Sequence, residues 1–102
     1  MLKIKLSKHA QSFLRNLPVK HAKQILAKID KLSADPASLP SKPLTGFPHY
    51  RRAKSGEYRI IYRIDEGVLL LLVVLIGKRN DSDVYRDFER IVGGNTTNID
   101  GE

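Results

Sequence analysis

The chain has 102 residues, enough for one domain with a single hydrophobic core and too few for two. It has no cysteine, which excludes disulfides and thiolate chemistry, and its longest apolar run, residues 68–76, is far shorter than the roughly 20 residues of a membrane-spanning helix. The net charge is +7, and residues 1–64 alone hold 14 basic and 3 acidic side chains. We therefore expect a cytoplasmic protein without a membrane partner that binds a polyanion.

The N-terminal third predicts a strand followed by two helices. Apolar residues alternate with lysines over residues 2–6, which is typical of a half-buried strand and unlike a signal peptide. Ser7 is a suitable N-cap for a short helix, and Pro18 suits the first turn of a second one. The second helix has an apolar stripe with a period of 3.6 residues and ends before Pro36. We expect the two helices to form an antiparallel hairpin.

The middle of the chain predicts a loop and then a β-hairpin. Residues 36–48 contain four prolines and one glycine, so we expect a stiff connecting loop, anchored by Leu44. The pattern then changes to strands, with a hairpin that joins residues 49–54 to 57–64. Within this hairpin Tyr58 and Tyr62 have the period-2 spacing of core residues.

The last third predicts one more strand and a helix. The aliphatic run 68–76 is typical of a central strand buried on both faces. Asp81 to Asp83 then favour the cap of a short last helix that carries Val84, Phe88 and Ile91, and residues 93–102 predict a flexible tail. The element order β-α-α-β-β-β-α predicts an α+β domain over residues 1–92, in which the N-terminal helical hairpin packs on an antiparallel twisted sheet.

Cations are concentrated on the predicted hairpin. A two-residue loop at 55–56 places Lys54 opposite Glu57 and Arg52 opposite Arg59. Like charges directly opposite each other destabilise a sheet by roughly 0.2–1 kcal/mol. Since residues i and i+2 share a face, Arg52, Lys54 and Arg59 point the same way. This arrangement indicates a missing anion, which we take to be a nucleic-acid phosphate.

A second basic segment follows the aliphatic strand. It consists of Gly77, Lys78 and Arg79, with Tyr85 six residues later. In an antiparallel sheet this segment can fold back beside the hairpin, so we expect both segments to form one site. No cluster of Asp, Glu and His has metal-ligand spacing, which argues against a metal-dependent nuclease.

These segments resemble the RelE/ParE superfamily of bacterial toxins. The resemblance extends over residues 1–92 and rests on four motifs, Leu44-x-Gly46, Arg52-x-Lys54, Gly56-x-Tyr58-Arg59-Ile60-Ile61-Tyr62 and Gly77-Lys78-Arg79-x5-Tyr85. RelE-like members are ribosome-dependent endoribonucleases, whereas ParE-like members poison DNA gyrase and lack the nuclease residues. The tyrosine at position 85 favours the RelE-like branch, and a catalytically inactive binding module is a third alternative.

The resemblance implies metal-free RNA cleavage without a cofactor, in which the ribose 2′-hydroxyl attacks the adjacent phosphorus. Arg59 and Arg79 are expected to stabilise the transition-state charge, with acid and base roles divided between Lys54 and Tyr85 in an order that stays open. Arg52 is expected to clamp a phosphate. The predicted catalytic residues are Lys54, Arg59, Arg79 and Tyr85. The predicted RNA contacts are Arg51 (as an alternative to Arg52), Arg52, Lys78 and His49.

The resemblance also implies partners. We expect an acidic RelB-like antitoxin, the ribosome with its mRNA, and a toxin that is monomeric when alone. Lysines on the second helix are expected to contact ribosomal RNA weakly. These are Lys20, Lys23, Lys28 and Lys31.

Overall fold

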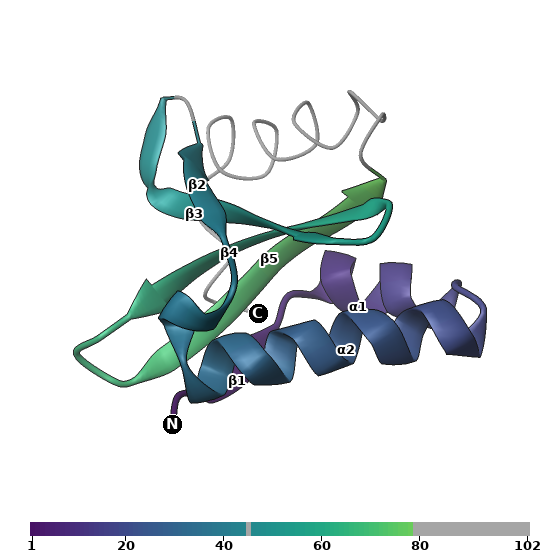
Figure 1. The fold of residues 1–102 in the computed structure, drawn as a ribbon, viewed down its shortest axis with the longest axis horizontal. Helices are drawn as coiled ribbons and strands as arrows, with labels where there is room; N and C mark the ends of the chain where they lie inside the picture. Colours follow the sequence, from purple (N-terminus) through teal and green to yellow (C-terminus); the bar gives the residue numbers. More distant parts are fainter. Residues whose placement is uncertain (45, 79–102) are drawn as a thin grey trace.

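The computed structural model describes residues 1–44 and 46–78, which form a sheet with two helices packed along one of its faces (Figure 1). The elements, in chain order, are β1 (Lys3–Leu6), α1 (Lys8–Arg15), α2 (Val19–Ala34), the short 3-10 helix η1 (Pro36–Ser38), β2 (Ser41–Leu44), β3 (Phe47–Ser55), β4 (Tyr58–Asp65) and β5 (Leu70–Lys78). The predicted C-terminal helix and tail lie outside the described residues. None of the described helices is long and apolar enough to cross a membrane.

The predicted helical hairpin is confirmed, and local sequence signals explain its limits. The Ser7 side chain accepts a hydrogen bond from the Ala10 amide at 3.1 Å and so caps α1. Pro18 lies just before α2, where its missing N–H costs no helical hydrogen bond. Helix α2 buries Ile25, Ile29 and Leu32 against the sheet, which is the predicted apolar stripe.

The sheet has the strand order β1-β5-β4-β3-β2. All neighbouring strands are antiparallel except β1 and β5, which are parallel and pair Lys3 with Leu70 through Leu6 with Val73. Strand β5 lies between β1 and β4, and its residues 71–77 are buried. The prediction that the aliphatic run forms a central strand is therefore confirmed for residues 70–76, whereas Val68 and Leu69 lie exposed in the turn before β5.

The prediction of a connecting loop over residues 36–48 misses the first two residues of β3, Phe47 and Pro48, and is also wrong for Ser41–Leu44. These residues form strand β2, which pairs antiparallel with β3. Pro43 cannot donate to a ladder, but β2 is at the edge of the sheet, where a strand tolerates proline because one side is unpaired. Gly46 has a φ of +83° between β2 and β3, a conformation that glycine adopts without strain.

The predicted hairpin register is also wrong, by one loop residue. The loop is Gly56–Glu57, so Ser55 pairs with Tyr58 and Lys54 pairs with Arg59. Gly56 has a φ of +57° and Glu57 does not have a positive φ, which is the pattern of a type II′ turn with glycine as its first central residue. The conformational requirement for glycine at that position fixes the register.

The sheet is buried on both faces. Toward the helices, Ala53, Tyr58, Ile60 and Tyr62 join the main core, which confirms that the two tyrosines are core residues. On the other face a second cluster gathers around Ile61. Its buried members are Leu44, Ile61, Leu72, Val74 and Leu75, with Phe47 and Tyr50 packed against them.

A bulge in β5 shapes this second face. Ile61 pairs with Leu75 and Tyr62 pairs with Val73, so Val74 has no partner residue in the β4–β5 register. As a result both Val74 and Leu75 belong to the second cluster. The Val74 carbonyl accepts a hydrogen bond from the buried Ser7 hydroxyl at 2.5 Å, which links the bulge to the cap of α1.

Candidate functional site

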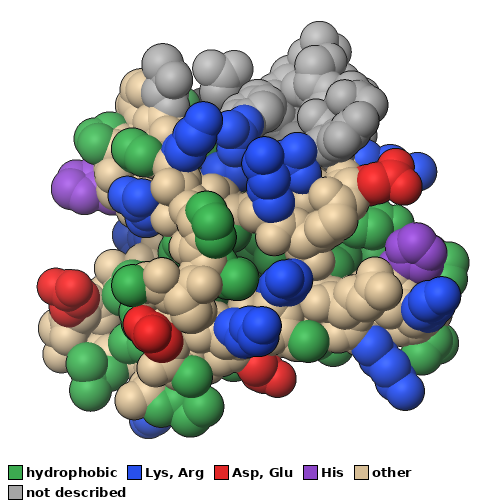
Figure 2. Space-filling view, viewed as in Figure 1, with side chains coloured by type: hydrophobic (Ala, Val, Ile, Leu, Met, Phe, Trp, Pro, Cys, Tyr) green, Lys and Arg blue, Asp and Glu red, His purple; other side chains and the backbone are tan. Residues whose placement is uncertain are grey.

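The structure places three of the predicted cations on one face of the β3–β4 hairpin. Ala53 and Ile60 point into the helix-side core, so their neighbours Arg52, Lys54 and Arg59 point to the face away from the helices. In Figure 2, Lys and Arg side chains gather in the upper part of the view, above the helix layer. The sequence prediction of a shared face for these three residues agrees with this arrangement.

The like-charge pair in the hairpin differs from the predicted one. Lys54, not Arg52, lies directly opposite Arg59, while Arg52 lies opposite Ile61. Glu57 is in the loop and is opposite neither cation. A pair of like charges in this position destabilises the hairpin by roughly 0.2–1 kcal/mol. Since the fold keeps this unfavourable pair, the face is well suited to bind an anion.

Arg59 is held at the tip of the hairpin. One guanidinium nitrogen donates to the Tyr58 carbonyl at 3.0 Å and to the Gly56 carbonyl at 3.4 Å. A guanidinium has five N–H donors, so these bonds use only part of its capacity. Arg59 pairs with Gly77 of β5, a residue without a side chain.

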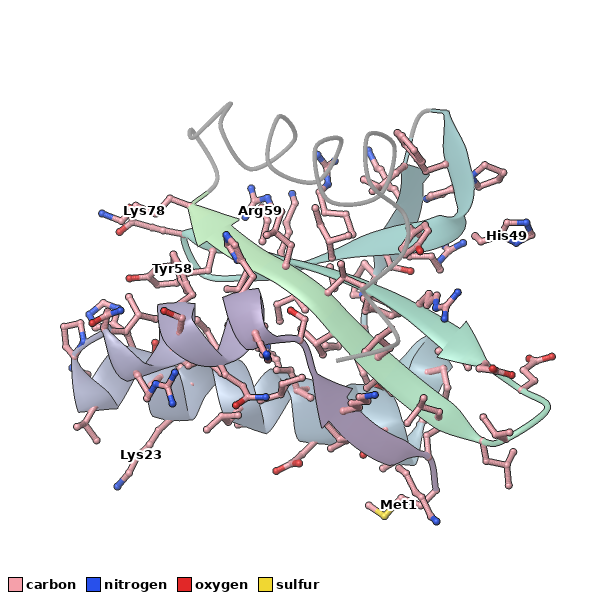
Figure 3. All side chains as sticks on the ribbon, turned by 180° about the vertical axis from the view of Figure 1, so that it is seen from behind. Met1, Lys23, His49, Tyr58, Arg59 and Lys78 are labelled. Carbon is pink, nitrogen blue, oxygen red and sulfur yellow. The ribbon has the colours of Figure 1, made fainter. Side chains whose placement is uncertain are left out.

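Lys78 lies at the same end of the sheet as Arg59 (Figure 3). It ends β5, is exposed, and pairs in register with Tyr58. The phenol of Tyr58 is 3.3 Å from Nδ1 of His21, which fixes the hairpin tip against α2. The segment that carries Arg79 and Tyr85 follows directly, and both of those predicted residues lie outside the described part of the chain.

Two predicted RNA contacts are not brought to this face. Arg51 pairs with Tyr62 and lies on the opposite side of the sheet, where its Nε donates to the Ser41 hydroxyl at 2.8 Å and a second nitrogen donates to the Ser41 carbonyl at 3.2 Å. Arg51 therefore ties β3 to β2. His49 is exposed and lies five residues before Lys54, up to about 17 Å away along the strand.

Figure 3 shows His49 at the far side of the molecule from Arg59 and Lys78. It lines a separate pocket of about 260 Å³ with Arg63 and Asp65. The Arg63 guanidinium lies 5.9 Å from the ring centre of Tyr50, within the range of a cation–π contact.

The lysines of α2 do not form one group. Lys20, Lys23 and Lys31 are exposed, and Lys23 points away from the sheet in Figure 3. Lys28 is half-buried and lines a pocket with Arg52 and Lys54.

Lys42 lines the same pocket, and sequence reasoning missed it. Residues 36–48 were expected to be a loop, whereas β2 places Lys42 directly opposite Arg52.

The described residues contain no group of three His, Asp or Glu side chains that could hold a metal ion. What the site offers is a dense set of fixed cations. Such an arrangement can bind a phosphodiester and stabilise negative charge that develops on it.

Comparison with known proteins identifies the family. The family model for the ParE toxin of the type II toxin–antitoxin system parDE matches residues 4–82, more than half of the chain. The chain belongs to the RelE/ParE superfamily of type II toxins. No curated protein sequence gives a significant match.

Solved structures show the fold of this RelE/ParE toxin. The isolated Escherichia coli RelE toxin is 22% identical, with a TM-score of 0.68 over 88% of this chain and 97% of that chain. The toxin–antitoxin complex RelBE2 of Mycobacterium tuberculosis contains a chain that is 24% identical, with a TM-score of 0.68 over 76% of this chain and 98% of that chain. The archaeal RelE–RelB complex of Pyrococcus horikoshii contains a chain that is 23% identical, with a TM-score of 0.65 over 79% of this chain and 98% of that chain. These likenesses confirm the predicted RelE-like α+β fold.

Proposed function

We propose that this toxin is a ribosome-dependent endoribonuclease that cuts mRNA in the ribosomal A site without a metal ion. The observation that carries the proposal is the Lys54–Arg59 pair, two like charges placed directly opposite each other beside the side-chain-free position of Gly77. Arg52 lies on the same face two residues from Lys54. A phosphate bound there relieves the repulsion between these cations and meets them in fixed positions.

The reaction requires two proton transfers and groups that stabilise the negative charge that develops on the phosphate oxygens. The ribose 2′-hydroxyl gives up its proton and attacks the neighbouring phosphorus, and the 5′-oxygen leaves with a proton. The products are a 2′,3′-cyclic phosphate and a 5′-hydroxyl. Arg59 is suited to bind the non-bridging oxygens as their charge grows, because backbone carbonyls hold its guanidinium at the hairpin tip. We assign a second such contact to Arg79.

The acid and base roles fall to Lys54 and Tyr85. Lys54 is the better proton-transfer group of the hairpin cations, because an ammonium releases a proton more readily than the guanidinium of Arg52. Arg52 then serves as a phosphate clamp. A phenol such as that of Tyr85 needs nearby cations to act as a base near neutral pH. The order of the two roles stays open in this proposal.

Partners follow from the same charge distribution. The M. tuberculosis and P. horikoshii relatives are complexes with RelB antitoxins. We propose an acidic RelB-like antitoxin for this toxin as well, because 14 basic against 3 acidic residues over positions 1–64 favour an acidic partner. The ribosome and its mRNA are the proposed targets, in the cytoplasm.

The matching family model favours one alternative, a ParE-like toxin that poisons DNA gyrase. Primer extension on mRNA from translating ribosomes separates the two functions. We expect new mRNA ends within the reading frame after addition of the wild-type toxin, little cutting of free RNA, and no DNA breaks with purified gyrase. Intact mRNA together with gyrase-dependent double-strand breaks would overturn the nuclease proposal, and inertness in both assays would support the inactive module.

A further inference from the structure

A second cationic feature lies at the edge of the sheet, where α2, the start of β2 and the end of β3 meet. It is a pocket of about 310 Å³. Among the described residues that line it, the basic ones come from three elements, namely Lys28 on α2, Lys42 on β2, and Arg52 and Lys54 on β3. Leu39 and Pro40, between η1 and β2, add an apolar wall, and the described lining includes no acidic residue.

The fold gathers these cations despite their repulsion. Lys42 lies directly opposite Arg52 on the β2–β3 ladder, which is a second like-charge pair beside that of Lys54 and Arg59. Lys28 is half-buried, although lysines usually keep their charge in water. Leu39 packs against the main core and thereby fixes the apolar wall next to the charges.

We propose that this pocket binds one nucleotide of a single-stranded RNA. Its phosphate is held by Lys28, Lys42 and Arg52, and its ribose or base lies against Leu39 and Pro40. A volume near 310 Å³ is at the lower end of the roughly 300–1,000 Å³ of small-molecule sites, which suits a single nucleotide.

Lys54 lines the pocket and also pairs with Arg59, so the bound nucleotide is a neighbour of the one that is cleaved. This inference rests on the proposed function, and it adds where the RNA strand lies next to the cleaved nucleotide. The mixed lining favours a nucleotide over an acidic peptide. A nucleotide offers both a phosphate and a flat apolar surface, whereas an acidic side chain uses only the cations.

A binding titration tests the pocket without cleavage. The probe is a fluorescent hexanucleotide RNA with 2′-O-methyl riboses, which lacks the attacking hydroxyl. Anisotropy is measured at several salt concentrations for the wild-type toxin and for the Lys28→Gln/Lys42→Gln variant. The matched control is Lys3→Gln/Arg15→Gln, which removes the same charge at exposed positions on β1 and α1.

We expect binding to weaken about tenfold in the pocket variant and less than twofold in the control. The slope of log K against log salt should fall by about 0.7, because the pocket neutralises one phosphate and the variant loses that contact. Equal weakening in the two variants, or no change in the pocket variant, would overturn the proposal. So would a hexaglutamate peptide that shows this dependence on Lys28 and Lys42 when the RNA does not.

The outcome is separate from that of the proposed function. A toxin that leaves ribosomal mRNA intact but binds the probe through Lys28 and Lys42 refutes the nuclease and supports the pocket. A toxin that cuts mRNA while the pocket variant binds the probe like wild type refutes the pocket alone. Urea unfolding of each variant confirms that both are folded in the titration.

Discussion

Replacement of Ser7 by alanine tests how the fold joins its two layers. Ser7 is only 7% exposed, and its hydroxyl makes two hydrogen bonds. It accepts from the Ala10 amide at 3.1 Å, which caps α1, and it donates to the Val74 carbonyl at 2.5 Å. Val74 is the bulged residue of β5, without a partner residue on β4. Ser7→Ala therefore removes the helix cap and the hydroxyl donor of a carbonyl at the bulge.

The expected decrease in stability follows from these two contributions. An N-cap serine replaced by alanine costs about 1 kcal/mol. A buried acceptor left without its donor costs about 1–3 kcal/mol. We therefore expect Ser7→Ala to lower the free energy of unfolding by about 2–4 kcal/mol, which is a large part of the stability of a small domain.

Urea denaturation followed by circular dichroism measures this change. Ser12→Ala is the matched control, because Ser12 is exposed on the same helix and should change the free energy of unfolding by no more than about 0.5 kcal/mol. If Ser7→Ala is also within about 0.5 kcal/mol of wild type, the two hydrogen bonds do not stabilise the junction and the reasoning is refuted.

Four further substitutions test particular side chains. Leu69→Gly should raise the free energy of unfolding by up to about 1 kcal/mol, because Leu69 has a φ of +54° and is 59% exposed; a lower melting temperature would contradict this. Tyr58→Phe should lower that free energy by about 0.5–1.5 kcal/mol by removing the hydrogen bond to His21, and unchanged urea unfolding would argue against that bond. Arg51→Gln should weaken the fold but not RNA binding, whereas Arg52→Gln should weaken binding in an anisotropy titration; the reverse result would mean that the two faces are wrongly assigned.

Local signals predicted most of the fold. Ser7 as a cap, Pro18 before the second helix and the aliphatic run each depend on a few neighbouring residues. The first two are confirmed, and the run forms the predicted strand over residues 70–76. Strand β2 was missed because its proline and flanking glycine are typical of loops. Only its position at the edge of the sheet, a property of the whole fold, makes it a strand.

The cationic face was predicted in spite of the register error. A shift of the hairpin loop by one residue moves each cross-strand partner by two positions, and side chains two apart share a face. Arg59 thus faces the same way whether it pairs with Arg52 or with Lys54.

The contribution of Lys28 and Lys42 was beyond sequence reasoning. Their place beside Arg52 depends on where α2 crosses the edge of the sheet and on the existence of β2. The residue spacing within one segment predicts neither the position of α2 at the sheet edge nor the presence of β2.

The most direct test of the account is the single-turnover rate of mRNA cleavage on programmed ribosomes by Arg59→Gln. Removal of one fixed donor to a developing oxyanion typically slows a reaction by about 10²–10³-fold. We expect a decrease of that size, with Arg15→Gln, an exposed site on α1, close to wild type. A rate for Arg59→Gln within about threefold of wild type would contradict the claim that the hairpin cations perform the chemistry.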